Sequence, residues 1–268
     1  MTNRDDLDQT LDLFLKMLRD FFGQRLVSLL LYGSVVFDDL APGYGDLDFL
    51  VTVEDDLAEQ ECRKLIELRK PLRDGAHGIL TTMLEGAFLP RDMLDPSRSG
   101  RALWWGTSGE RIWDRNQLGW LALHAIRECG IVTWGEDVRC EIPVAEQDAL
   151  LDDVRVACQT TRQHGRAGSL HSLDWLLTAA RLLLWLREGR LSSKSAAAEW
   201  GYRHAYGTWR SLLLQARDIR LNPAIARSTN TQAWLKALTD PIQEACAEIE
   251  RELTEWQEPR QRQQQQEG

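Results

Sequence analysis

Apolar and polar positions follow different patterns in the two halves of the chain. In the first half, apolar runs of strand length alternate with segments whose apolar residues recur at helical spacing. The pattern predicts helices at 7–22, 57–72 and 116–130 and strands at 25–34, 46–55 and 77–90. Two aromatic segments flank Gly-Thr-Ser-Gly-Glu within 101–114 and predict a hairpin or flap. Strands interleaved with helices predict an α/β domain, with a mixed sheet and flanking helices.

From about residue 144 onward the apolar spacing is helical almost throughout. Residues 131–143 are expected to form a connecting arm, and the chain after it predicts an all-α bundle. The helices are predicted at 145–163, 173–189, 193–204, 208–220 and 231–256. The expected domains are therefore residues 1–145 and 146–257. The low-complexity tail, 258–268, is predicted to be disordered.

The composition limits the partners of the protein. The formal net charge is −9 and the pI is about 5.2. An acidic chain repels phosphate backbones, so no nucleic-acid partner is expected, whereas a small cationic substrate is compatible. No apolar run approaches a signal peptide or a transmembrane helix. We expect a cytoplasmic protein without membrane contact, a monomer or a weak dimer.

Two carboxylates stand at the start of the second strand. Side chains alternate along a strand, so Asp46 and Asp48 share one face while Leu47 points into the core. Two carboxylates this close repel one another unless a cation lies between them. Oxygen ligands of this kind suit Mg²⁺, which completes its coordination with water and substrate phosphates.

Polar residues on the neighbouring strands extend this pattern. Gly33 and Ser34 end the preceding strand, where a glycine permits close backbone approach and the hydroxyl and nearby N–H groups can hold phosphate oxygens. Glu85 is a lone acid in an apolar strand. It is expected to be either a metal ligand or a general base of raised pKa. A phosphate site beside a divalent-metal site indicates nucleotide chemistry.

These residues carry a family resemblance. The segment Leu-Tyr-Gly-Ser, followed by Gly-Asp-Leu-Asp-Phe-Leu-Val, resembles the signature of the DNA polymerase β-like nucleotidyltransferase superfamily. The segments LEGAFL, IRECGIVTWGEDVRCEIP and LLTAARLLLWLREGRLSSKSAAAEW resemble streptomycin/spectinomycin (aminoglycoside) adenylyltransferases. In that family they correspond to the strand with the catalytic glutamate, the arm between the domains, and the helical C-terminal domain.

The resemblance implies a role for each matched residue. The residues it assigns are Asp46 and Asp48 for Mg²⁺ (two ions), Gly33, Ser34, Arg181 and Lys194 for the phosphates of the co-substrate ATP, and Glu85 as the base that takes the proton from the attacking hydroxyl. Cations at the phosphates suit the charge that develops as pyrophosphate departs. Residues 1–145 would then be the nucleotidyltransferase domain, and 146–257 the domain that closes over nucleotide and substrate.

This chain departs from the family pattern at several positions. Gly45 stands where the family tends to have Ser before its Asp-x-Asp. The substrate-binding acid of the family falls on His171 and its nearby histidine on Asp174, so the two are exchanged. A late tyrosine is replaced by Arg220. These changes do not affect the residues assigned to nucleotidyl transfer, but they leave the identity of the acceptor undecided.

Three tryptophans lie on the predicted flap: Trp104, Trp105 and Trp113. They are expected either to pack an interface or to stack on a sugar or flat ring of the substrate, and Trp105 is our candidate for the second role. His171, Asp174 and Trp105 are thus the predicted substrate residues.

The predicted activity is Mg²⁺-dependent transfer of AMP from ATP to a hydroxyl of a small cationic acceptor, in first place an aminoglycoside or aminocyclitol of the streptomycin or spectinomycin type. Two alternatives remain open. One is a nucleotidyltransferase of the same fold that acts on another metabolite or on a protein. The other is a nucleotide-binding regulatory module without turnover. Transfer to RNA is disfavoured by the net charge of the chain.

Overall fold

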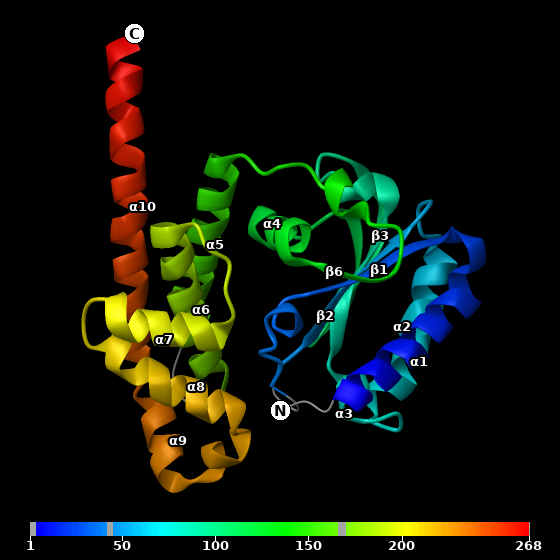
Figure 1. The fold of residues 1–268 in the computed structure, drawn as a ribbon, viewed down its shortest axis with the longest axis horizontal. Coiled ribbons are helices and arrows are strands. Elements are labelled where there is room, and N and C mark those ends of the chain that lie inside the picture. The colour runs from blue at the N-terminus through cyan, green and yellow to red at the C-terminus, as the bar shows by residue number, and fades with distance from the viewer. Residues whose placement is uncertain (1–3, 42–44, 166–169, 268) are drawn as a thin grey trace. The chain divides into compact units, whose positions relative to one another are not determined.

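The computed structural model describes residues 4–41, 45–165 and 170–267, with side chains described as far as residue 256 (Figure 1). The chain separates into two compact units, residues 1–145 and 146–268, and each is described by itself. Within the described ranges, no helix is both long enough and apolar enough to cross a membrane.

The first unit is built on one six-stranded sheet with the order β5-β4-β3-β2-β1-β6. Strands β2 and β3 run parallel, while the other neighbouring pairs run antiparallel, so the sheet is mixed. The strands are β1 (Leu26–Tyr32), β2 (Leu47–Val53), β3 (Leu84–Pro90), β4 (Ser99–Gly106), β5 (Gly109–Arg115) and β6 (Ile131–Gly135).

Successive strand residues pack into two hydrophobic cores, one on each face of the sheet. On one face Phe49 meets Phe14 of α1 edge-to-face, with ring centroids 4.8 Å apart. On the other face Leu50 packs with Leu123 of α4. Side chains alternate along a strand, so Asp48 lies on the same face as Leu50. The helices of this unit are α1 (Arg4–Phe22), α2 (Glu59–Arg73), α3 (Ile79–Thr82) and α4 (Trp120–Cys129) (Figure 1).

The second unit is helical, with α6 at its centre. This helix is apolar around most of its circumference and contacts α5, α7, α8 and α10, as is typical of a helix enclosed by others. The helices are α5 (Gln147–His164), α6 (Leu170–Glu188), α7 (Lys194–His204), α8 (Leu213–Leu221), α9 (Thr229–Lys236) and α10 (Thr239–Glu267). A mixed sheet with flanking helices, followed by a helical unit, confirms the predicted fold class.

Several predicted elements differ in detail in the first unit. The expected arm at 131–143 contains β6, which pairs with β1 and forms an edge of the sheet. Its Val-Thr-Trp run suits a strand, but only the neighbouring strand makes it one. The strand expected from residue 77 begins at Leu84, because Ile79–Thr82 forms the short helix α3. The sequence predicts that Pro71 breaks the helix expected at 57–72, but α2 continues through Pro71 and ends two residues later.

The end of the chain also differs from expectation. The helix predicted at 231–256 is divided into α9 and α10, and Pro241 lies in the first turn of α10, where a proline costs little. The backbone of α10 is helical as far as Glu267, whereas the sequence predicted disorder from residue 258. Gln and Arg, which dominate this stretch, are good helix formers.

Candidate active site

Three neighbouring strands, β1, β2 and β3, have ends that lie side by side, and the predicted carboxylates lie at these ends. In the register of β1 with β2, Tyr32 is opposite Asp48, and in that of β2 with β3, Asp48 is opposite Glu85. Neighbouring strands are about 4.8 Å apart, and residues in register point to the same face. Asp48 and Glu85 are therefore adjacent side chains, on the face of the sheet that α4 covers further along.

Gly33 is required at the end of β1 for two reasons. Its φ of +72° lies in the left-handed region, which favours glycine. A Cβ placed on Gly33 would also lie 1.9 Å from Oδ2 of Asp48, well inside van der Waals contact. The carboxylate of Asp48 thus occupies the space that the missing side chain leaves. The Gly-Ser motif and the Asp-x-Asp motif are parts of one packed arrangement.

Ser34 connects this turn to the other aspartate. Its hydroxyl donates to the backbone carbonyl of Asp46 at 3.4 Å, and its own carbonyl accepts from the N–H of Asp39 at 3.0 Å. Ser34 also precedes the short 3-10 helix Val35–Phe37. The hydroxyl therefore holds the two ends of the connection between β1 and β2 together. The predicted contact of Ser34 with phosphate stays a prediction.

The hydroxyl of Tyr32, the residue before Gly33, is affected by all three predicted carboxylates. Burial raises the pKa of the Tyr32 hydroxyl well above its usual value, and the charges of Asp48, Glu85 and Asp46 raise it further, in that order. All three carboxylates thus act on one hydroxyl. Such a concentration of carboxylate oxygens suits a hard divalent cation, so the residues present fit Mg²⁺. No group of three or more His, Cys, Asp and Glu side chains with metal-site geometry occurs among the described residues.

Glu85 is held by the turn between β4 and β5. Its Oε2 accepts from the N–H of Thr107 at 2.7 Å and from the hydroxyl of Thr107 at 2.8 Å. We call this pair of bonds the Glu85–Thr107 contact. Both bonds reach the same oxygen, Oε2, so they fix the side chain in one orientation. The side chain is neither fully buried nor fully exposed. Its role as general base or metal ligand stays a prediction.

The flap tryptophans occupy opposite faces of the sheet, and the prediction for Trp105 is wrong. Trp105 is 0% exposed and packs against Phe49 and Phe88, so it cannot reach a substrate. Side chains alternate along a strand, so Trp105 points to the face of the sheet opposite to that of Trp104. Trp104 lies on the face of Glu85, is partly exposed, and stacks on Trp113 with ring centroids 5.3 Å apart.

The residues predicted in the helical unit share one stripe of α6. His171, Asp174 and Arg181 recur at helical spacing, and none of them is buried, whereas their neighbours Leu173 and Ala180 are buried. Arg181 and His171 are thus at least partly accessible. The stripe is the part of α6 that the bundle leaves uncovered.

Lys194 joins this stripe from the start of α7. Its Nζ donates to Oδ1 of Asp174 at 2.5 Å, and both side chains are about one quarter exposed. Ser193 caps α7 by accepting from the N–H of Ala196, which fixes where Lys194 begins the helix. A residue predicted for ATP and a residue predicted for the acceptor are therefore direct partners.

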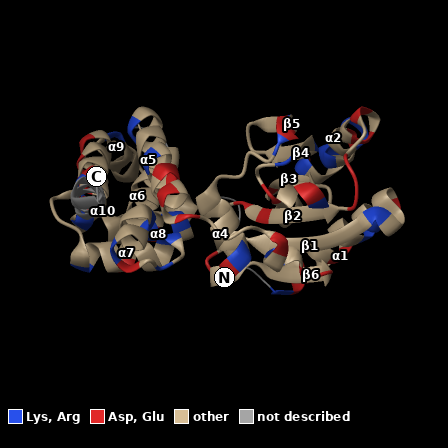
Figure 2. Cartoon of the chain, turned by 90° about the horizontal axis from the view of Figure 1, so that it is seen from above, with Lys and Arg blue, Asp and Glu red and all other residues tan. Residues whose placement is uncertain are grey.

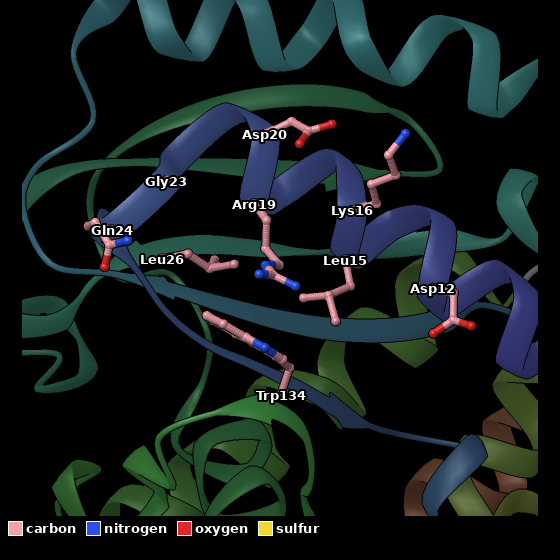
Figure 3. A pocket seen from close by; sticks show the side chains of 9 residues that line it. All are labelled: Asp12, Leu15, Lys16, Arg19, Asp20, Gly23, Gln24, Leu26 and Trp134. Atoms are coloured by element: carbon pink, nitrogen blue, oxygen red, sulfur yellow. The ribbon is translucent and has the colours of Figure 1, made fainter.

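A cavity of about 490 Å³ lies elsewhere on the first unit (Figure 3). It opens beside Leu26 at the start of β1, whereas Tyr32 and the carboxylates are at the other end of that strand, about 20 Å away at the rise of a strand. Acids, bases and an indole line it together: Asp12, Leu15, Lys16, Arg19, Asp20, Gly23, Gln24, Leu26 and Trp134. It contains none of the predicted site residues, and its mixed charge specifies no ligand class.

A mixed sheet whose adjacent strand ends carry Gly-Ser, Asp-x-Asp and Glu, followed by a helical unit, has the architecture of a nucleotidyltransferase. Residues 142–250 match the family described as aminoglycoside adenylyltransferase, C-terminal domain. This match indicates a nucleotidyltransferase enzyme. The predicted resemblance to the aminoglycoside adenylyltransferases is confirmed.

A solved structure of similar fold is that of the spectinomycin adenyltransferase AAD(9) from Enterococcus faecialis, determined with ATP and spectinomycin. The TM-score is 0.69 at 14% sequence identity, over 90% of this chain and 98% of that one. At this identity the likeness concerns the fold. A search of curated proteins found no significant match.

Sequence reasoning missed two residues at the strand edge. Tyr32 belongs to the Leu-Tyr-Gly-Ser motif. Its position directly before Gly33 is a signal from which strand alternation could have predicted its place beside the carboxylates. Thr107 lies in the Gly-Thr-Ser-Gly-Glu turn, and only the register of β3 with β4 brings it to Glu85. No local pattern in the sequence marks it.

Proposed function

We propose that this protein transfers AMP from Mg²⁺-bound ATP to a hydroxyl group of a small cationic acceptor, and that the acceptor is an aminoglycoside or aminocyclitol. The observation that carries the proposal is the register that places Asp48 beside Glu85, with Gly33 making room for the carboxylate of Asp48. The family match of residues 142–250 supports the class of acceptor.

The chemistry divides between the residues of the strand edge. Asp46 and Asp48 would hold Mg²⁺, which when bound neutralises phosphate charge and orients the triphosphate. Gly33 and Ser34 are assigned to the phosphate oxygens, which their backbone N–H groups would bind. These residues bind and orient ATP. Most of the rate enhancement of phosphoryl-type transfer comes from such positioning and charge stabilisation.

Glu85 is assigned as the base that accepts the proton of the attacking hydroxyl. The attacking hydroxyl oxygen forms a bond to the α-phosphorus of ATP while the bond from that phosphorus to the bridging oxygen of pyrophosphate breaks. The hydroxyl proton passes to Oε1 of Glu85, since Thr107 occupies Oε2. The products are the adenylylated acceptor and pyrophosphate. Positioned general bases of this kind contribute about 10²- to 10⁴-fold to rates.

The helical unit supplies further groups to the proposal. Arg181 and Lys194 are assigned to the ATP phosphates, and Asp174 and His171 to the acceptor. The carboxylate of Asp174 suits an ammonium group of the acceptor. Acidic and basic residues are interspersed along the ribbons of both units in Figure 2. Trp104 replaces Trp105 as the flap residue that would stack on the acceptor.

The test is a panel of acceptors. The purified protein is incubated with Mg²⁺, ATP and in turn spectinomycin, streptomycin, an unrelated sugar alcohol and a generic protein, with pyrophosphate release and acceptor mass as readouts. The proposal predicts pyrophosphate release and one added AMP with an aminoglycoside or aminocyclitol. Transfer only to another metabolite or to a protein would instead support the first alternative. Binding of ATP without any release would support a regulatory module.

A further inference from the structure

We propose that Arg69 of α2 is a positioning residue for Glu85, acting from the opposite face of the sheet through the turn that carries Thr107. The inference rests on the proposed role of Glu85 as the base. It assigns a function to a buried cation that neither the sequence motifs nor the family match include.

Arg69 bridges two strands at the positions directly before the Glu85–Thr107 contact. Its Nη2 donates to the carbonyl of Leu84 at 3.0 Å, and its Nη1 donates to the carbonyl of Gly106 at 3.0 Å. Leu84 precedes Glu85, and Gly106 precedes Thr107. One guanidinium therefore fixes the distance between the two backbone segments that carry the contact.

The bridge lies where the strand pairing ends. The ladder between β3 and β4 runs from Phe88 to Gly86, and its last pair is Gly86 with Trp105. Beyond that pair, at Glu85, no ladder partner holds the two strands together. The bonds of Arg69 replace the missing ladder bonds there, because its rigid planar fork reaches two carbonyls at once.

Arg69 is itself locked in place. Its side chain is only 3% exposed, its Nη1 also donates to Oε1 of Glu110 at 2.9 Å, and its Cζ lies 5.4 Å from the ring centroid of Trp105. Burial lowers its pKa, as does repulsion from Arg73, while the charges of Glu110 and Glu85 oppose this. A buried cation needs such partners to be tolerated. The charge of Arg69 is thus coupled to that of Glu85 as well as to the turn.

A second arginine supports the same turn more weakly. Arg73, one turn further along α2, donates to the carbonyl of Thr107 at 3.2 Å and lies 3.4 Å from Glu110, but it is 41% exposed. Both arginines reach the turn, yet only Arg69 also contacts β3. This makes Arg69 the residue that relates Thr107 to Glu85.

The consequence is kinetic. When Arg69 is replaced, Thr107 moves relative to Glu85 and the carboxylate loses its fixed orientation. Misplacement of a reacting group by about 1 Å costs on the order of 100-fold in rate. Arg69→Met is therefore expected to lower kcat about 10- to 100-fold while KM for ATP stays near the wild-type value. Arg69→Lys is expected to behave similarly, because a single ammonium does not reproduce the fork.

The experiment compares Arg69→Met and Arg69→Lys with Arg63→Met, an exposed arginine of the same helix that pairs only with Glu59. Steady-state kinetics with Mg²⁺, ATP and the accepted acceptor are measured together with hydrogen exchange of the Thr107 amide by NMR. We expect lower kcat and faster amide exchange in both Arg69 variants, and neither change in Arg63→Met. In a Glu85→Gln background, Arg69→Met should lower the residual rate little further.

The outcomes separate this inference from the proposed function. A folded Arg69 variant with wild-type kcat, or with wild-type exchange of the Thr107 amide, overturns the inference. If Arg69→Met does not fold, Arg69→Lys provides the same decision. Thr107→Val tests the Glu85–Thr107 contact separately, since Thr107 is exposed and its hydroxyl bond alone is removed. A wild-type protein that transfers AMP to no acceptor contradicts the proposed function, and the amide exchange then decides about Arg69 alone.

Discussion

The carboxylate of Asp48 fills the space beside Gly33, where any Cβ would lie 1.9 Å from Oδ2. This relationship joins two motifs that are separate in the sequence, and it explains why the turn after β1 tolerates only a glycine. A substitution at Gly33 should therefore have two effects, backbone strain from its positive φ and displacement of the Asp48 carboxylate, and a control glycine can separate them.

Gly33→Ala is expected to lower the free energy of unfolding by more than the about 1–2 kcal/mol that its φ of +72° alone costs, and also to abolish transfer by displacing Asp48. Gly23→Ala is the matched control, because Gly23 has a φ of +56° and no atom within 4 Å of the added Cβ. Urea unfolding and pyrophosphate release are measured for both. Retention of full activity in Gly33→Ala, at a stability equal to that of Gly23→Ala, would contradict the packing account.

The two adjacent tryptophans of β4 are expected to give opposite results. Trp105→Ala removes a fully buried ring and should cost about 3–5 kcal/mol of stability. Trp104→Ala removes a partly exposed ring that stacks on Trp113, so its main effect should be a raised KM for the acceptor. Thermal unfolding and acceptor kinetics distinguish the two. If Trp104→Ala leaves acceptor KM unchanged, the assignment of Trp104 to the acceptor is wrong.

The pairing of Lys194 with Asp174 gives a prediction for the helical unit. Lys194→Met should raise KM for ATP about 10-fold through loss of a phosphate contact, and Asp174→Asn should raise KM for a cationic acceptor by a similar factor. Stability should change by less than about 1 kcal/mol in either variant, because partly exposed ion pairs contribute little.

Lys70→Met serves as the control for Lys194→Met. It breaks an exposed pair with Glu67 on α2 and should leave both KM values at the wild-type level. If Lys194→Met and Asp174→Asn both behave like Lys70→Met, the pair only joins α6 to α7 and neither residue binds a ligand.

The positions of Asp46 and Asp48 were predictable because they stand at the start of an apolar run, and that of Glu85 because it is a lone acid in an apolar strand. Strand alternation, on which both predictions rest, is a local property. The face occupied by Trp105 was not, since it depends on the register of β4 with β3. The same register places Thr107 at Glu85. Strand β6 was also missed, because an edge strand is defined by its neighbour. Tertiary pairing thus determined what the local pattern left undecided.

The most direct test of the account is the comparison of wild type with Glu85→Gln, in which AMP transfer to spectinomycin or streptomycin and binding of Mg²⁺-bound ATP are measured separately. We expect Glu85→Gln to bind ATP as the wild type does, because Asp46, Asp48 and Gly33 remain, and to transfer AMP about 10²- to 10⁴-fold more slowly. Transfer by Glu85→Gln at the wild-type rate would contradict the central claim that this carboxylate takes the proton from the acceptor.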